Sequence, residues 1–242
     1  MFRTLLAVTV LALFALVVGL PLLLLAWISG TIGPFYPAAA LGFRLALTLA
    51  GVRTRVDGRE NIPAGACLYM ANHTSAVDPI AVLISLPGRV AFLAKQELFR
   101  IPLLGWAMRK AGFIPVDRSS RELAAASAGL AVEQLQKGAS MVIYPEGTRS
   151  PDGRLLPFKR GGFLMAIRAG RPVVPITITG AERVLPKGAK WLRAGEIRLQ
   201  CHRPIDVSRY QEKDREKLLD QVREVIASGL PEELRQAELP GG

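Results

Sequence analysis

His73 is one of only two histidines in the chain. The pair Asn72-His73 directly follows an apolar run, and His73 precedes the acid Asp78 by five positions. Histidine is the side chain best suited to move a proton near neutral pH, and a carboxylate that holds its second ring nitrogen makes it a better base. Residues five apart on one helix point about 140° away from each other, so this pairing needs a turn before a helix that begins near Asp78. The pair predicts general-base catalysis, although the spacing alone equally fits a packed loop histidine and an aspartate that caps a helix.

A second polar segment, Tyr-Pro-Glu-Gly-Thr-Arg-Ser at residues 144–150, follows another apolar run. Arg149 offers a planar fork of donors that suits a phosphate. Glu146 is suited to accept hydrogen bonds from substrate hydroxyls or to orient Arg149, and Gly147 and Thr148 lie between them. The alternative is an ordinary surface turn with an ion pair, since the adjoining Ser-Pro-Asp-Gly is typical of a turn.

Three further groups of residues are candidates for the same site. Lys95 and Arg118 are expected to face the same crevice, although each alone is more typical of a solvated surface. Residues 158–162, Phe-Lys-Arg-Gly-Gly, precede a predicted helix and form a candidate anion cradle. The third group, Val174, Pro175 and Ile176, suits either an acyl-chain pocket or a core strand.

These residues need elements that bring them to one place. The apolar runs predict strands at residues 52–56, 66–71, 90–94, 112–116, 141–144, 173–179 and 196–201, and helices at 79–86, 102–111, 120–136, 162–169 and 212–226. Strands separated by helices indicate an α/β fold with a mostly parallel, mixed and twisted sheet covered by helices on both faces. Ligands bind beyond the carboxyl ends of such strands, which is where His73 and the 144–150 segment are predicted to lie.

The N-terminal region predicts a membrane anchor, because no charged residue occurs between Thr4 and Phe43. Its first 24 apolar residues would form a helix of about 36 Å, enough for a bilayer core of roughly 30 Å and longer than a signal peptide needs. A second apolar stretch, residues 35–52, contains Arg44. Either the first helix spans the bilayer, or a kink at Pro21 lets both helices lie as a hairpin in one leaflet.

The distribution of arginines predicts the orientation of that anchor. Arg44, Arg53 and Arg55 lie downstream of the apolar run and Arg3 lies upstream, which favours placing the bulk of the protein on the cytoplasmic face of the membrane. We expect the anchor at residues 1–52, an α/β domain at 53–230 and a frayed tail at 231–242.

Composition narrows the class of partner. The net charge of +11 indicates a polyanionic partner, such as an anionic membrane or a phosphorylated substrate. Nucleic acid is disfavoured, because aromatic residues make up only 7% of the chain and are not interleaved with the basic ones. The two cysteines, Cys67 and Cys201, are expected to be buried and reduced, and no cluster predicts a structural zinc or another metal.

Four segments together resemble the glycerolipid acyltransferase family that includes 1-acylglycerol-3-phosphate acyltransferases. They are Asn-His-Thr-Ser-Ala-Val-Asp at residues 72–78, Gly-Phe-Ile-Pro-Val-Asp-Arg at 112–118, the 144–150 segment and Val-Val-Pro-Ile at 173–176. The order and the separations match the four motif blocks of that family, and the apolar N-terminal helices are similar to the anchor of its bacterial members.

The resemblance implies that His73, oriented by Asp78, is the general base on the sn-2 hydroxyl of a lysophospholipid. That hydroxyl would attack the thioester of acyl-CoA or acyl-carrier protein directly, with no covalent acyl-enzyme, giving phosphatidic acid. Arg149, with Arg118 and Lys95, would hold the acceptor phosphate, and Glu146 would help to position the glycerol. The acyl donor is a co-substrate, and no cofactor is implied.

Other functions remain open from the sequence. The acceptor could be another lysolipid, such as a lyso-ornithine lipid or a lysophospholipid with a larger head group. The same base could activate water in a thioesterase, although hydrolysis does not need so many cations. A non-catalytic module that binds the membrane through its basic surface and apolar anchor is a third alternative.

Overall fold

The computed structural model of the chain describes residues 1–116 and 121–235. Within them, strands β1 to β7 form one sheet in the order β1-β7-β6-β2-β5-β3-β4. Their bounds are Val52–Asp57, Leu68–Ala71, Val90–Lys95, Ile114–Val116, Ser140–Ile143, Val173–Thr179 and Gly195–Cys201. The strands β6, β2, β5, β3 and β4 run parallel, whereas β7 is antiparallel to β6 and parallel to β1. The predicted mixed, mostly parallel sheet is therefore confirmed.

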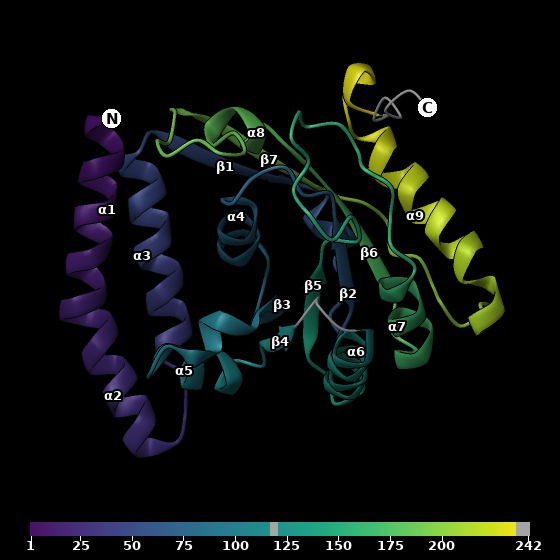
Figure 1. Ribbon diagram of the computed structural model, residues 1–242, viewed down its shortest axis with the longest axis horizontal. Coiled ribbons are helices and arrows are strands. Elements are labelled where there is room, and N and C mark those ends of the chain that lie inside the picture. The colour runs from purple at the N-terminus through teal and green to yellow at the C-terminus, as the bar shows by residue number, and fades with distance from the viewer. Residues whose placement is uncertain (117–120, 236–242) are drawn as a thin grey trace.

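Helices cover both faces of this sheet (Figure 1). They are α1 Phe2–Phe14, α2 Leu20–Ser29, α3 Phe35–Leu49, α4 Asp78–Ser85, α5 Leu104–Lys110, α6 Arg121–Gln136, α7 Gly161–Ala169, α8 Ala181–Val184 and α9 Arg215–Ser228. Short 3₁₀ turns occur at Arg59–Asn61, Gln96–Arg100, Glu212–Asp214 and Glu232–Leu234. One apolar core lies under α1, α3, α4 and α8, and a second lies under α6, α7 and α9.

Strand β2 shows how the sequence builds two cores at once. Leu68 and Met70 belong to the core under α6, α7 and α9, and Tyr69 and Ala71 to the core under α1, α3 and α4. Side chains alternate across a strand, so a central strand that is covered on both sides must be apolar at every position. This explains why the run before His73 has no polar break.

The N-terminal helices form an antiparallel pair on one side of the sheet domain (Figure 1). Helices α1 and α2 are continuous through a π-helical turn at Ala15–Gly19, which lies just before Pro21. Pro21 has no N–H to donate to the preceding turn, and a π-bulge is a usual way to accommodate that loss within a helix. The resulting Phe2–Ser29 helix is long and apolar enough to cross a membrane, and its most apolar window is not buried in the protein.

The anchor is also packed against the α/β part of the chain. Ala7 from α1 and Ala46 and Leu47 from α3 are buried in the same core as the central strands. Helix α3 ends at Leu49 and β1 begins at Val52. The two predicted parts of the chain thus share one core.

The prediction of a frayed tail is wrong for residues 231–235. A 3₁₀ turn covers Glu232–Leu234, and the Leu234 carbonyl accepts a 2.9 Å hydrogen bond from the Leu155 amide. The Arg235 side chain donates to the Leu230 carbonyl at 3.1 Å. The long-range bond from Leu155 and the local bond of Arg235 hold the segment.

Candidate active site

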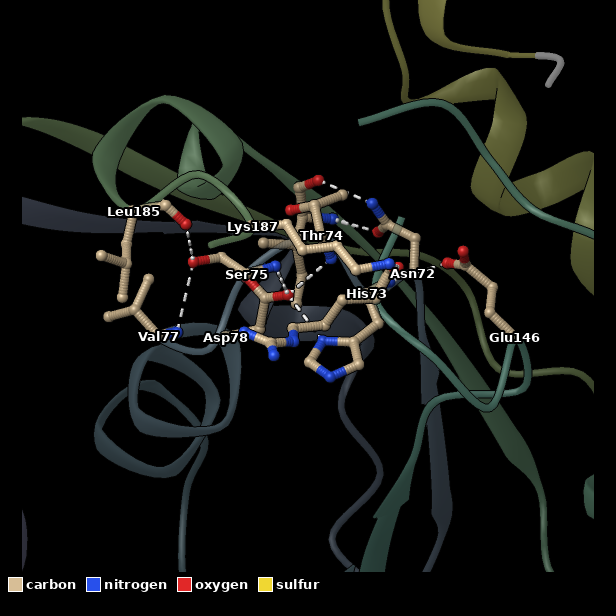
Figure 2. Close-up of polar contacts among 11 residues, drawn as sticks. Asn72, His73, Thr74, Ser75, Val77, Asp78, Glu146, Leu185 and Lys187 are labelled. Atoms are coloured by element: carbon tan, nitrogen blue, oxygen red, sulfur yellow. Dashed lines mark hydrogen bonds and ion pairs between the residues drawn. The ribbon is translucent and has the colours of Figure 1, made fainter. Parts of the chain in front are cut away.

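His73 and Asp78 meet at the carboxyl end of β2 (Figure 2). The Nδ1 atom of His73 lies 2.8 Å from Oδ2 of Asp78, whose side chain is fully buried while that of His73 keeps 17% of its surface exposed. An ionised carboxylate only accepts, so the ring proton sits on Nδ1 and the lone pair on Nε2. The arrangement leaves Nε2 as the nitrogen that can receive a proton.

The same carboxylate oxygen also organises the turn. Oδ2 of Asp78 accepts the backbone amides of Thr74 and Ser75, each at 2.8 Å. Asp78 is the first residue of α4, follows the N-cap position at Val77, and makes no side-chain capping bond to that helix. The alternative in which Asp78 caps its own helix is therefore wrong, because its acceptor is used by the loop that carries His73.

Asn72 directly follows strand β2, and its side chain fixes where the loop begins. Its side-chain amide donates to the Ile178 carbonyl at 2.9 Å and accepts the Ile178 amide at 2.7 Å. The side chain thus takes the place of a peptide in the ladder to β6, and Asn72 is 1% exposed. Sequence reasoning gave Asn72 no role, because this bond spans 106 positions.

Glu146 holds the backbone of His73. One oxygen of its carboxyl group accepts the His73 amide at 2.7 Å, and the other accepts the Leu156 amide at 3.2 Å. The Ser150 amide donates to the His73 carbonyl at 2.7 Å, so both backbone groups of His73 are bound by the 144–150 segment. Glu146 is 3% exposed. Among the described residues the carboxyl group binds these two backbone amides and makes no ion pair with Arg149, in contrast to the orienting role expected from the sequence.

Burial dominates the electrostatics of this cluster. It raises the pKa of Glu146 to about 8, with a smaller contribution from the charge of Asp78, while the two amide bonds act in the opposite direction. Burial likewise raises the pKa of Tyr144 well above its usual value, again with a contribution from Asp78. Tyr144 is therefore neutral, and its ring stacks on the His73 ring with centroids 4.1 Å apart. Tyr144 is a second residue to which the sequence analysis assigned no separate role.

Unpaired polar atoms concentrate at this place. Within the described residues, the buried side-chain atoms without a hydrogen-bond partner are Thr74 Oγ1, Asp78 Oδ1 and Tyr144 Oη. Leaving such atoms unpaired costs about 1–3 kcal/mol each, and exceptions of this kind call for a specific explanation. Their grouping around one histidine supports a functional site.

The other predicted residues are more dispersed. Gly147 has a φ of +71°, and a Cβ there would lie 2.8 Å from Cε of Lys159, so the 144–150 turn has a second cation, Lys159, over Gly147. Thr148 is exposed and Arg149 is half-buried. Lys95 is exposed at the carboxyl end of β3, separated from β2 by β5. Arg118 lies outside the described residues.

The structure uses Val174, Pro175 and Ile176 as core strand. All three are buried in β6, between β2 and β7. An apolar hollow of about 330 Å³ lies elsewhere, between the 72–78 loop and the anchor, lined among others by Ala76, Val77 and Leu185. Of the two uses expected for the 174–176 run, core packing is the one observed.

Comparisons with known proteins place this site in context. A family model described as Acyltransferase matches residues 53–179. The chain is 37% identical over 207 residues to a chloroplastic 1-acyl-sn-glycerol-3-phosphate acyltransferase of Brassica napus, which covers 84% of this chain and 54% of that protein. It is 32% identical over 188 residues to the 1-acyl-sn-glycerol-3-phosphate acyltransferase of Borreliella burgdorferi, with 77% and 75% covered. The chain thus spans about half the length of the plant relative.

A solved structure matches nearly the whole chain. The crystal structure of the 1-acyl-sn-glycerophosphate acyltransferase PlsC from Thermotoga maritima aligns with a TM-score of 0.77 and 28% identity. The alignment covers 98% of this chain and 99% of that one, so it includes the N-terminal helices as well as the sheet.

Proposed function

The chain belongs to the acyltransferase family, and from that premise we propose that it transfers a fatty acyl group from a thioester donor to the sn-2 hydroxyl of lysophosphatidic acid, giving phosphatidic acid. The relatives and the PlsC structure are named as acyltransferases of 1-acyl-sn-glycerol-3-phosphate, which supports the acceptor part of the proposal. The observation that carries the proposal is the His73–Asp78 contact of 2.8 Å at the carboxyl end of β2.

The geometry supports a mechanism with His73 as general base. Nε2 of His73 takes the proton of the acceptor hydroxyl while the hydroxyl oxygen attacks the thioester carbonyl carbon. Asp78 stabilises the imidazolium that forms on His73. The new C–O bond gives a tetrahedral intermediate, the C–S bond then breaks, and the proton on Nε2 passes to the leaving thiolate. No acyl group is attached to the protein at any step.

Cations near the base are suited to the acceptor phosphate. Arg149 lies in the turn whose Ser150 amide binds the His73 carbonyl, so a phosphate held by Arg149 is close to the base. Gly147 and Thr148 shape that turn. Lys95, at the carboxyl end of β3, and Arg118, which lies outside the described residues, are the further candidates. We assign Glu146 to positioning His73, because amides occupy both of its oxygens.

Both substrates carry long apolar chains, and the protein offers apolar surface for them. The N-terminal helix exposes leucines and other large apolar side chains along its length. We propose that α1 to α3 embed in the lipid bilayer, with the α/β domain on the cytoplasmic face, where acyl-CoA or acyl-carrier protein is found. The hollow beside Ala76 and Val77 lies between that anchor and the catalytic loop.

The test is acyl transfer by purified protein in mixed micelles with lysophosphatidic acid and acyl-CoA, for wild type and His73→Ala. We expect a loss of at least about 100-fold in turnover, the usual scale for a lost general base. The matched control is His202→Gln, which changes the other histidine and should retain activity. Turnover of His73→Ala near that of wild type would refute the assignment of the base.

The identity of the reaction product distinguishes the proposed acyltransferase from the alternative functions. Free fatty acid as the main product with excess acceptor would indicate a thioesterase. Faster turnover with another lysolipid would show that the acceptor has a different head group, and the proposed mechanism would still apply.

A further inference from the structure

The loop between α8 and β7 contacts both catalytic loops and the first helix. Its residues 185–192 lie at the top of the molecule in Figure 1, between α8 and the start of β7. The Arg193 amide donates to the Val184 carbonyl at 2.8 Å and closes the base of this loop. We call residues 185–192 the strap.

We propose that the strap positions the His73–Asp78 pair and ties it to helix α1, with Thr4, Ser75 and Lys187 as positioning residues. This inference rests on the proposed function, because its kinetic consequence is on acyl transfer. Its evidence is a set of hydrogen bonds across 38 to 188 positions of the sequence.

The first contact is to the loop that carries His73. The Ser75 hydroxyl donates to the Leu185 carbonyl at 2.7 Å and accepts the Val77 amide at 3.3 Å (Figure 2). Ser75 is fully buried, and its own amide is one of the donors to Oδ2 of Asp78. A displacement of Leu185 would therefore be transmitted through Ser75 to the carboxylate that orients His73.

The second contact is to the other catalytic loop. Nζ of Lys187 donates to the Arg149 carbonyl at 2.8 Å. The next amide, that of Ser150, donates to the His73 carbonyl. Lys187 thus stabilises the 144–150 segment, which in turn holds the backbone of His73.

The third contact reaches the N-terminal helix. The Thr4 hydroxyl accepts the Leu192 amide at 3.0 Å and donates to the Leu192 carbonyl at 3.3 Å. Thr4 is 6% exposed, and Leu192 packs against the core that contains Ala7 and Val77. A hydroxyl in an otherwise apolar helix is satisfied here by the strap, so the position of α1 and that of the strap are coupled.

The decisive comparison is Thr4→Val against Thr9→Val. Thr9 lies on the same helix and is exposed, so the control makes the same chemical change away from the strap. The assay uses mixed micelles, in which wild type and variants meet both substrates at the same concentrations. We expect Thr4→Val to lower kcat by roughly 10-fold with KM unchanged, because small displacements of catalytic groups slow the reaction strongly. Thr4→Ser, which restores the hydroxyl, should recover activity. Equal kcat for Thr4→Val and Thr9→Val would overturn the coupling.

Lys187→Met tests the exposed end of the strap, where a folding defect is not expected. A fall in kcat with unchanged KM supports positioning. A raised KM for the acceptor with unchanged kcat would show that Lys187 contacts substrate and would overturn its assignment. Lys213→Met, which alters an exposed lysine outside the strap, is the control.

A spectroscopic readout separates failure of this inference from failure of the proposed function. With ¹⁵N-histidine labelling, the Nδ1 proton shared with Asp78 should appear at low field, and His202→Gln identifies the other histidine. We expect that resonance to shift or broaden in Thr4→Val and to remain in Thr9→Val. An unaltered resonance would reject the strap even if the wild type lacked acyltransferase activity.

Discussion

At the scale of single residues, the site is a histidine whose ring and backbone are both fixed. Asp78 holds Nδ1, Tyr144 stacks on the ring, and Glu146 binds the amide. Such a side chain loses little freedom when it reacts, which is the preorganisation that general-base catalysis requires. Glu146 of the 144–150 segment therefore acts on His73, the proposed base, and we propose Arg149 for the substrate phosphate.

Arg149→Ala should separate the two substrates. Its side chain belongs to the turn beside His73, so its removal should raise KM for the phosphorylated acceptor while KM for the acyl donor changes little. Initial rates with each substrate varied in turn measure both constants. Lys159→Ala, which removes the cation lying over Gly147, shows whether neighbouring charge alone has the same effect. Equal increases for donor and acceptor would assign Arg149 to structure or to the donor.

Glu146→Gln should change how stability depends on pH. The folded pKa of about 8 lies above the unfolded value near 4.5, so the folded state binds this proton more tightly. The stabilisation is complete below about pH 4.5 and is lost as pH rises towards 8. Glutamine keeps an acceptor for the His73 amide and does not titrate.

Thermal unfolding in mild detergent at pH 5.5 and pH 8 measures this effect. We expect wild type to lose more stability than Glu146→Gln between the two values. If the stability difference between wild type and Glu146→Gln stays constant with pH, Glu146 has the same protonation in the folded and unfolded states.

At the scale of elements, the carboxyl ends of β2 and β5 bring the 72–78 loop and the 144–150 segment together, and the Asn72 side chain bonds the first of them to Ile178 of β6. Thr177 on β6 is buried, and its hydroxyl donates to the Ile226 carbonyl in α9 and accepts from Nε2 of His202, both at 2.8 Å. Burial lowers the pKa of His202, so the ring is held neutral for this bond. One hydroxyl therefore joins the strand beside the site to the C-terminal helix.

Thr177→Val should lower the free energy of unfolding by about 1–3 kcal/mol, because it leaves a buried carbonyl and a ring N–H without partners. Thr179→Val, a half-buried residue on the same strand, should change it by less than about 0.5 kcal/mol. Urea unfolding in detergent measures both variants. An equal effect at the two positions would mean that α9 is held by apolar packing alone.

At the scale of the whole molecule, a basic α/β domain with a net charge of +11 is combined with an apolar helical pair that shares its core. Positive charge next to apolar surface is suited to an anionic bilayer. The domain and the anchor are linked through the strap as well as through packing, so binding at the membrane and catalysis are expected to depend on the same helix.

Deletion of residues 1 to 43 should release much of the protein from anionic lipid vesicles. Flotation on a density gradient measures this, because vesicle-bound protein rises whereas any aggregate formed by exposing Ala46 and Leu47 sinks. Full-length protein is the control. Full flotation of the deleted chain would show that the basic surface is sufficient for binding.

The sequence alone determined the elements and which residues follow them. Apolar runs and their turn signals predicted β6 as residues 173–179, as observed, and α4 to within one residue. They also placed His73 and the 144–150 segment after strands, because local periodicity reflects burial directly.

Only the tertiary structure decided what those residues contact. Spacing did not show whether Asp78 faces His73 or the helix amides, nor that Glu146 binds a backbone amide 73 positions away. The roles of Asn72 and Leu185 depend on bonds across 106 and 110 positions. Such contacts are created when distant strands pair and their loops meet at one edge of the sheet, and no local pattern in the sequence encodes them.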